Sequence, residues 1–258
     1  GFGADLGAEK FLNIKCREAN IKPNCVVLVV TIRALKMHGG VEKDNLKKEN
    51  IDALKKGLPN LDRHLQNLKK FGLEVVVAIN HFITDTDKEI KIVKEHCSKM
   101  RVKVSLCTHW SEGGKGTEDL ANNVVEICKN NNKNNFKYLY SEDAPIIKKI
   151  EIITKEIYRA SRVEIADQIK SQIKKIEESG FGKFPICIAK TQYSFSEDPK
   201  IKGAPSGHAI SVREVRLSTG SKFIVVVCGS IMTMPGLPRN PAADLIKLNK
   251  KGDIEGLF

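Results

Sequence analysis

The first half of the chain alternates short apolar runs with longer segments in which apolar residues recur every three or four positions. The runs at residues 25–31, 73–80 and 102–106 have the length and the β-branched composition of strands. The run at 73–80 is almost continuously apolar, which is typical of a strand buried on both faces of a parallel sheet. The repeated strand–helix order predicts right-handed crossovers and an α/β fold, a parallel sheet with flanking helices.

The longer segments have the periodicity of amphipathic helices. Between the first two strands the apolar spacing places one stripe on one helix face, formed by Ile51, Leu54, Leu58, Leu61, Leu65 and Leu68. Gly57 and Pro59 fall inside this pattern and predict a break or bend. After the second strand, Asp85 or Thr86 is a candidate N-cap for the next helix.

The pattern changes beyond about residue 140. Two lysine-rich helices are predicted at about 145–160 and 165–179. Shorter apolar runs follow, separated by glycine and proline turns, at 185–190, 209–217 and 223–227. This order is typical of a smaller α+β unit. We therefore predict an α/β domain over residues 1–140 and a C-terminal α+β domain over residues 141–258.

Length and composition indicate a globular protein of one large or two ordinary domains, because the chain has 258 residues and 41% hydrophobic content. The seven cysteines are odd in number and form no C-x-x-C pair, so we expect reduced thiols and no metal site. The sequence contains neither an apolar stretch of roughly 18 residues nor a signal-peptide pattern. We therefore expect a soluble, cytoplasmic protein.

The net charge of +12, from 43 basic and 31 acidic residues, is compatible with nucleic acids, anionic membranes or acidic small molecules as partners. The clusters at 148–155 and 170–175 are interleaved with isoleucines at helical spacing, which is typical of solvated helix faces. The aromatic and glycine pattern of RNA-binding sheets is absent from the sequence. We therefore expect small-molecule partners, no nucleic acid and no membrane.

Two predicted strands end in loops that carry an aromatic residue. Phe82 follows the second strand, and Trp110, the only tryptophan, follows the third and precedes polar residues and two glycines. Ligands of open α/β sheets collect at the carboxyl ends of the strands. Two rings facing each other across a gap would clamp a flat heterocycle, so Phe82 and Trp110 are candidate binding residues.

Charged residues and glycines supply the other candidates. Arg33, Lys36 and His38 follow the first strand and are candidates for holding phosphate, although exposed or salt-bridged loop charges would give the same pattern. Gly1, Gly3 and Asp5 lie in the opening GFGADLGAEKF, where the backbone of a glycine-rich loop could approach a ligand before a helix begins at about Ala8. Taken alone, a glycine cluster is more often a turn.

Several of these motifs resemble one enzyme family. The segment VVTIRALKMHGG at 29–40 resembles a signature of the formate–tetrahydrofolate ligases, with Val30 where the family normally has alanine. The opening GFGADLGAEKF, NHFITDT after the second strand and HWSEGGKG after the third are similar to further motifs of that family. KTQYSFSEDP, VREVRLSTG and IMTMPGLPRNPAA extend the resemblance to the C-terminus, so that it covers essentially the whole chain.

The resemblance implies a two-step reaction. ATP, with Mg2+, phosphorylates formate to formyl phosphate, and the N10 amine of tetrahydrofolate then attacks the formyl carbon and expels phosphate. It also implies that Phe82 and Trp110 sandwich the pterin ring, and that the loop of Gly1, Gly3 and Asp5 helps to line the formyl-phosphate pocket. Members of the family tend to form homo-oligomers, so we expect one here.

The resemblance further implies that the sheet is the remainder of a P-loop NTPase-like domain. The family's phosphate-binding loop lies in its N-terminal half, and no G-x-x-x-x-G-K-[ST] occurs in this sequence. We therefore expect the C-terminal portion of a ligase, supplying the folate pocket and inactive alone. One alternative is a non-catalytic folate- or nucleotide-binding subunit completed by a separate N-terminal chain. Another is a nucleic-acid-binding protein, whose affinity would fall steeply with salt.

Overall fold

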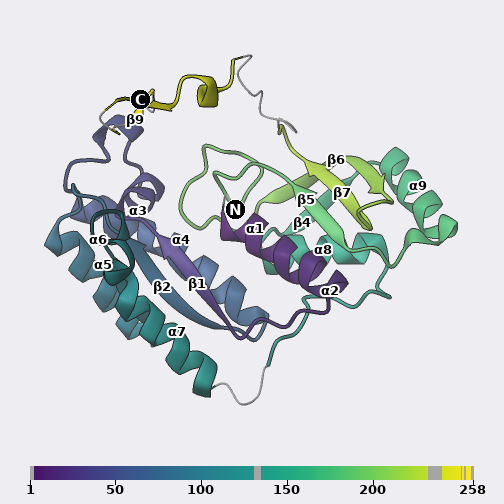
Figure 1. Ribbon diagram of the computed structural model, residues 1–258. Coiled ribbons are helices and arrows are strands. Elements are labelled where there is room, and N and C mark those ends of the chain that lie inside the picture. The colour runs from purple at the N-terminus through teal and green to yellow at the C-terminus, as the bar shows by residue number, and fades with distance from the viewer. Residues whose placement is uncertain (1–2, 131–134, 232–239, 251, 253, 257–258) are drawn as a thin grey trace.

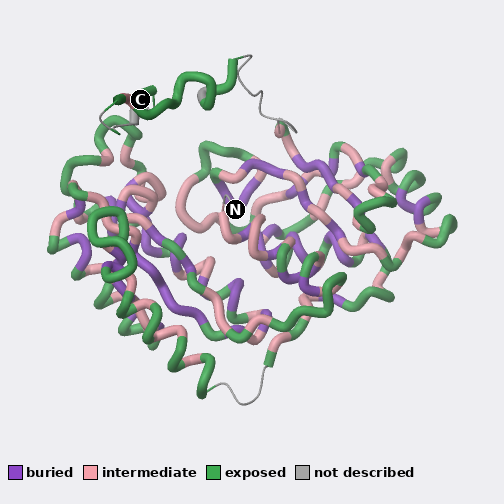
Figure 2. Tube along the Cα trace, viewed as in Figure 1, coloured by how far each residue is buried: buried purple, intermediate pink, exposed green. Residues whose placement is uncertain are grey.

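The computed structural model describes residues 3–130, 135–231, 240–250, 252 and 254–256. Two sheets lie in two lobes, with the N-terminal helical segment between them (Figure 1). Buried apolar residues of both lobes form one continuous cluster, and buried stretches run through both sheets in Figure 2. The predicted boundary near residue 140 lies in the chain between the lobes and stays a prediction. None of the described helices is both long and apolar enough to cross a membrane.

The first sheet confirms the predicted parallel strands. It contains β1 (Cys25–Val30), β2 (Glu74–Asn80) and β3 (Lys103–Cys107) in the order β1-β2-β3. Both pairings are parallel, with Val29 opposite Ala78 and Ala78 opposite Ser105. The central strand β2 is the most buried of the three, as its continuous apolar run predicts.

Helices cover both faces of this sheet. The leucine stripe of α4 (Ile51–Lys70) packs in the core with Leu28 and Val77, and α5 (Asp87–Lys99) lies beside α4. The opposite face carries α7 (Glu118–Asn130), whose Asn123 Nδ2 donates to Ser105 Oγ at 3.0 Å. Two shorter helices, α3 (Ile32–His38) and α6 (His109–Glu112), directly follow β1 and β3, and a 3-10 turn at Gly113–Thr117 joins α6 to α7.

Of the break or bend predicted at Gly57 and Pro59, the break is wrong, because α4 continues through both residues. The bend stays a prediction. Pro59 is exposed, so water can satisfy the carbonyl that loses its hydrogen bond there. Gly57 serves close packing instead, since a Cβ there would lie 1.9 Å from the carbonyl oxygen of Leu35 in α3. Gly39 has the matching role, because its Cβ would lie 1.8 Å from the carbonyl oxygen of Ala53.

The second sheet is mixed, in agreement with an α+β unit. Its order is β4-β6-β7-β5, formed by β4 (Arg162–Ile165), β5 (Ile186–Ala189), β6 (Ala209–Ser218) and β7 (Phe223–Cys228). β6 and β7 are antiparallel, and the two outer pairings are parallel. The predicted helices correspond to α8 (Ile146–Glu156) and α9 (Asp167–Ile176), the latter continued by a π-helical turn at Glu177–Phe181. The four-residue β4 was not predicted.

The N-terminal helical segment joins the lobes. α1 (Ala4–Lys10) begins earlier than the predicted Ala8 and continues through a π-helical turn at Phe11–Lys15 into α2 (Cys16–Glu18). α1 contacts both α4 and β5. The C-terminal segment carries a 3-10 turn at Ala242–Asp244 and the short strands β8 (Lys247–Leu248) and β9 (Ile254–Glu255). The PGLP loop at 235–238 lies outside the described residues.

Candidate functional site

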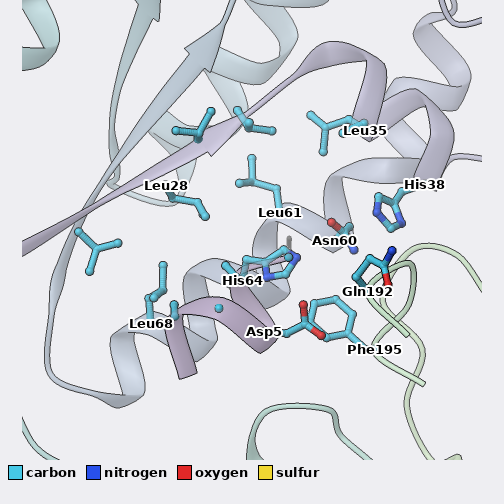
Figure 3. A pocket seen from close by; sticks show the side chains of 18 of the residues that line it. Asp5, Leu28, Leu35, His38, Asn60, Leu61, His64, Leu68, Gln192 and Phe195 are labelled. Atoms are coloured by element: carbon cyan, nitrogen blue, oxygen red, sulfur yellow. The ribbon is translucent and has the colours of Figure 1, made fainter. Parts of the chain in front are cut away.

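A cavity of about 730 Å3 lies where the two lobes meet the N-terminal helix (Figure 3). Its volume is in the range of small-molecule pockets, roughly 300–1,000 Å3. One side is apolar and is formed by β1, with Leu61 and Leu68 of α4. Polar side chains gather on the other side, namely Asp5, His38, Asn60, His64, Gln192 and Ser194. The arrangement provides an apolar wall and a set of convergent hydrogen-bonding groups.

Asp5 is fixed by a buried ion pair that joins the N-terminal helix to the second lobe. Lys190 Nζ, at the end of β5, lies 3.1 Å from Asp5 Oδ2 and also donates to the carbonyl oxygens of Thr191 and Ser194. Burial lowers the pKa of Lys190, and the charge of Asp5 opposes that shift. The Lys190 ammonium also lies 4.7 Å from the centroid of the Tyr158 ring. This pairing holds the start of α1 against the second sheet.

Of the opening loop, Gly3 borders the cavity and Gly1 lies outside the described residues. Gly3 is the N-cap of α1 and has φ +64°, a conformation that favours glycine. A Cβ there would also lie 2.6 Å from Asp5 Oδ1. The glycine therefore permits the approach of the loop to the Asp5 carboxylate. The expectation that this loop lines a phosphate pocket stays a prediction.

His38 reaches the cavity as a neutral side chain. Its Nδ1 accepts a hydrogen bond from the backbone N–H of Gly203 at 3.2 Å, so a neutral ring carries its proton on Nε2. Burial lowers the pKa of His38 to about 4, and His64 and Lys202 add to the shift. Near neutral pH, His38 is thus a hydrogen-bonding group and not the cation that the sequence suggested.

The polar face of α4 supplies functional groups that the sequence analysis missed. Asn60 Nδ2 donates to the carbonyl oxygen of Gly203 at 2.8 Å, and Arg63 donates to those of Ala204 and Pro205. The ring of His64 packs against Phe195 with centroids 4.8 Å apart, and its buried Nδ1 has no hydrogen-bond partner among the described residues. Asn60 and His64 lie along one border of the leucine stripe, so polar residues beside the apolar face were the available signal.

Arg33 and Lys36 lie on the side of α3 that faces away from the cavity lining. The Arg33 guanidinium lies 4.0 Å from the centroid of the Phe82 ring, and Nη2 donates to Thr84 Oγ1 at 3.1 Å. Lys36 is buried, with Nζ 2.9 Å from Glu89 Oε1 and 2.8 Å from the carbonyl oxygen of Lys48. The structure therefore does not bring the three candidates of this segment together: His38 borders the cavity, and the other two support the loop after β2.

Phe82 lies in an ordered turn. Its N–H donates to Asp85 Oδ2 at 2.9 Å, and the Asp85 N–H donates to the Phe82 carbonyl oxygen at 2.8 Å. Thr86 caps α5 in a capping box with Glu89, which confirms one of the two predicted caps. Together with Arg33 these contacts fix the half-buried Phe82 ring.

Trp110 lies in α6, directly after β3, with 57% of its surface exposed. The His81 N–H donates to the Cys107 carbonyl oxygen at 3.2 Å, which joins the ends of β2 and β3. Phe82 and Trp110 therefore follow the carboxyl ends of neighbouring parallel strands, as predicted. Their role as a clamp stays a prediction. Among the described residues, no group of three or more histidine, cysteine or carboxylate side chains has an arrangement suited to a metal ion.

Comparison with known proteins identifies relatives of this chain. The family model for formate–tetrahydrofolate ligase matches residues 1–258. Formate–tetrahydrofolate ligases of Pelagibacter ubique and Hyphomonas neptunium are 64% and 58% identical to the chain over its full length. The chain covers 46% of each of these relatives, so it spans about half of their length. Because the family match and this identity extend over every motif described above, the chain belongs to the formate–tetrahydrofolate ligase family.

Proposed function

We propose that this chain supplies the folate pocket of an ATP-dependent formate–tetrahydrofolate ligase. The observation that carries the proposal is the placement of Phe82 and Trp110 after neighbouring parallel strands, in a chain that belongs to this family throughout. The substrates are formate, tetrahydrofolate and ATP with Mg2+. The product is tetrahydrofolate formylated at N10, formed through formyl phosphate.

In this proposal the pterin ring lies between Phe82 and Trp110. Phe82 is already held by Arg33 and Asp85, so little of its freedom remains to be lost on binding. Trp110 is exposed, and its side chain becomes ordered when the pterin ring binds. Holding the ring flat aims N10 at the formyl carbon, which is a proximity effect. Arg33 and Lys36 contribute by positioning the Phe82 loop, Lys36 through its ion pair with Glu89.

The cavity beside α3 is the proposed place of the formyl-phosphate group. The Gly3 backbone, the Nε2–H of His38 and the amides of Asn60 and Gln192 are the donors available to an oxyanion. Phosphoryl transfer itself consists mostly of positioning and charge neutralisation, and we assign its phosphate-binding loop to the part of the ligase outside this chain.

We also propose that the first sheet is part of the ligase's nucleotide-binding sheet. β1 is an edge strand of the described sheet, and 39% of Val27 and 62% of Val29 are exposed on it. Exposed β-branched residues on an open strand edge are typical of a surface that another element covers. The remaining length of the relatives is sufficient to provide such an element.

The lone tryptophan allows a direct test of the folate pocket. Tetrahydrofolate is titrated into the chain while Trp110 fluorescence is followed, with Phe82→Ala as the test variant and Phe181→Ala, in the other lobe, as the control. We expect saturable quenching, with affinity weakened in Phe82→Ala by about 1–3 kcal/mol, the usual contribution of one stacking contact. Equal affinity in both variants would contradict the assignment.

A second candidate function follows from the fraction of the relatives that the chain covers. The chain could be a non-catalytic folate- or nucleotide-binding subunit that needs a separate N-terminal chain. The N-terminal portion of the Pelagibacter ubique ligase, added to this chain, separates the two. Formylation by the mixture, but not by either part alone, supports the ligase; folate binding without turnover in the mixture supports the binding subunit.

A further inference from the structure

Two cysteines from distant parts of the sequence meet at the edge of the first sheet. Cys25 is the first residue of β1, and Cys128 lies in the last turn of α7, 103 positions later. Their sulfur atoms are 3.9 Å apart. The spacing of cysteines in the sequence gives no indication of this contact, and the sequence analysis treated all seven as ordinary reduced thiols.

This pair differs from the other cysteines in its access to solvent. Cys128 is exposed and Cys25 is half-buried, whereas Cys16, Cys97, Cys107 and Cys228 are buried. Solutes therefore reach Cys128 first. The remaining thiol, that of Cys187, is half-buried on β5 in the other lobe.

The surroundings of the pair permit the sulfur atoms to approach further. A disulfide needs a separation of about 2 Å, so they must close by roughly another 2 Å. Rotation about the Cα–Cβ bonds supplies part of this, and the supporting elements can supply the rest. Every residue of α7 is exposed or half-buried, and β1 is an edge strand, so neither element is held on all sides by close packing.

We propose that Cys25 and Cys128 form a site of reversible oxidative modification, at which a small-molecule disulfide converts the two thiols into a disulfide between β1 and α7. The proposed modification does not require the folate pocket, because it depends on the contact between the two sulfur atoms and on their access in the 258-residue chain.

The chemistry is a two-step exchange. The Cys128 thiolate attacks one sulfur of the oxidant, for example oxidised glutathione, and expels one glutathione thiolate. The Cys25 thiolate then attacks the Cys128 sulfur of this mixed disulfide and expels the second glutathione thiolate. The two thiol protons pass to the released thiolates through water, and the oxidant gains the two electrons that the cysteines lose. Burial raises the pKa of Cys25, so the second step accelerates with rising pH.

The bond would close a long loop that contains most of the first sheet. Such a cross-link reduces the freedom of the unfolded chain, so the oxidised protein melts at a higher temperature than the reduced protein. It also ties α7 to the strand whose residues 26–30 form the apolar wall of the cavity.

The experiment exposes the 258-residue chain to oxidised glutathione, alkylates the remaining thiols and measures intact and peptide masses. We expect the alkylated thiols to fall from seven to five, the mass before alkylation to fall by two hydrogen atoms, and one peptide to join Cys25 to Cys128. Dithiothreitol should reverse the change and the gain in melting temperature. Cys128→Ser should prevent both, whereas Cys187→Ser should prevent neither.

Other products would overturn the proposal. A stable glutathione adduct at Cys128 would mean that Cys25 does not reach it. A dimer linked through Cys128 would mean that the exposed thiol prefers a second copy. Seven unreacted thiols in a folded sample, shown by its unchanged circular dichroism spectrum, would mean that the pair is inert packing.

Discussion

Glu89 in the first lobe and Glu9 between the lobes are equally inaccessible, with 0% and 1% of their surfaces exposed, but their surroundings differ. Glu89 accepts from Lys36 Nζ at 2.9 Å, from the Asn50 N–H at 3.1 Å and from the Thr86 N–H at 3.2 Å, so both oxygens are used. Glu9 accepts from Asn13 Nδ2 at 2.7 Å through one oxygen. Its other oxygen has no partner among the described residues.

The partners of a buried carboxyl, and not burial alone, therefore decide whether it holds the structure together or titrates. Glu89 joins α3, the start of α4 and the cap of α5, and so supports the loop that carries Phe82. Burial raises the pKa of Glu9 to about 7. Glu9 therefore gains and loses a proton near neutral pH, one helical turn from Asp5 at the cavity.

The largest effect on stability is expected when Lys36, the cation paired with Glu89, is replaced. Lys36→Met leaves the Glu89 carboxylate buried without its counter-ion, and we expect a loss of about 3–5 kcal/mol in the free energy of unfolding. Urea denaturation measures it. Lys91→Met, which breaks an exposed pair with Glu95, is the control and should change stability by less than about 0.5 kcal/mol. Equal effects of the two substitutions would show that the buried Lys36–Glu89 pair contributes no more to stability than an exposed pair.

Glu9→Gln should increase the free energy of unfolding, whereas Lys36→Met should lower it. The pKa of Glu9 is about 7 in the folded chain against 4.5 as the ordinary value, so the folded state binds more protons between these values. The stability that Glu9 contributes is therefore complete below pH 4.5 and is lost as the pH rises through 7. Uncharged glutamine avoids this loss, and we expect it to stabilise the chain by about 3 kcal/mol at about pH 8.5 and little at about pH 4.5.

Urea denaturation of Glu9→Gln at both pH values tests this, with Glu89→Gln as the matched control. Glu89→Gln should destabilise the chain at both values, because it leaves Lys36 buried without its carboxylate. A Glu9→Gln variant whose stability changes equally at the two values would show that Glu9 does not titrate in this range.

A smaller effect is expected at the cap beside Glu89. Thr86→Ala removes the hydroxyl that accepts from the Glu89 N–H at 3.3 Å, and a lost cap typically costs about 1 kcal/mol. Thermal unfolding checks the value, and Thr86→Ser, which keeps the hydroxyl, should restore most of the loss. A loss as large as that of Lys36→Met would mean that Thr86, and not the ion pair, holds this region.

The smallest effect is expected beside Glu9. The buried Tyr158 hydroxyl has no hydrogen-bond partner among the described residues, and burial raises its pKa well above the ordinary value, with Glu9 adding to the shift. Tyr158→Phe removes an unsatisfied polar group and should leave stability within about 0.5 kcal/mol of the parent or slightly increase it. A loss of more than about 1.5 kcal/mol in thermal unfolding would contradict this expectation and show that the hydroxyl makes a favourable polar contact, for example with a buried water.

Local patterns predicted the elements well because these depend on nearby residues. The apolar run of β2 and the Thr86 cap were both identified in this way. Pro59 misled the prediction, because its effect depends on whether the affected carbonyl faces water, which is a tertiary property. In the second sheet only β4 was not predicted, because an alternation over four residues is too short to recognise.

The candidate site was harder to predict because its residues come from different elements. Sequence proximity grouped Lys36 with His38, but α3 directs the first towards Glu89 and the second towards the cavity. Nothing in the neighbouring sequence indicates that Asn60 and Lys190 belong to one site. Only the packing of the lobes brings Asn60 into the cavity lining and Lys190 against Asp5 at the cavity border. Phe82 and Trp110 were found because strand ends of a parallel sheet share one edge.

The contact of Gly39 and Gly57 has a consequence for protein engineering. Each glycine leaves the space that a backbone carbonyl of the opposite helix occupies, so even one added methyl group at either position must push α3 from α4. The direction of α3 sets both the His38 ring at the cavity and the Arg33 guanidinium on Phe82. In a saturation library these two positions should tolerate no other residue, while the exposed positions of α4 beside them accept most. Attempts to redesign the cavity should therefore leave both glycines unchanged.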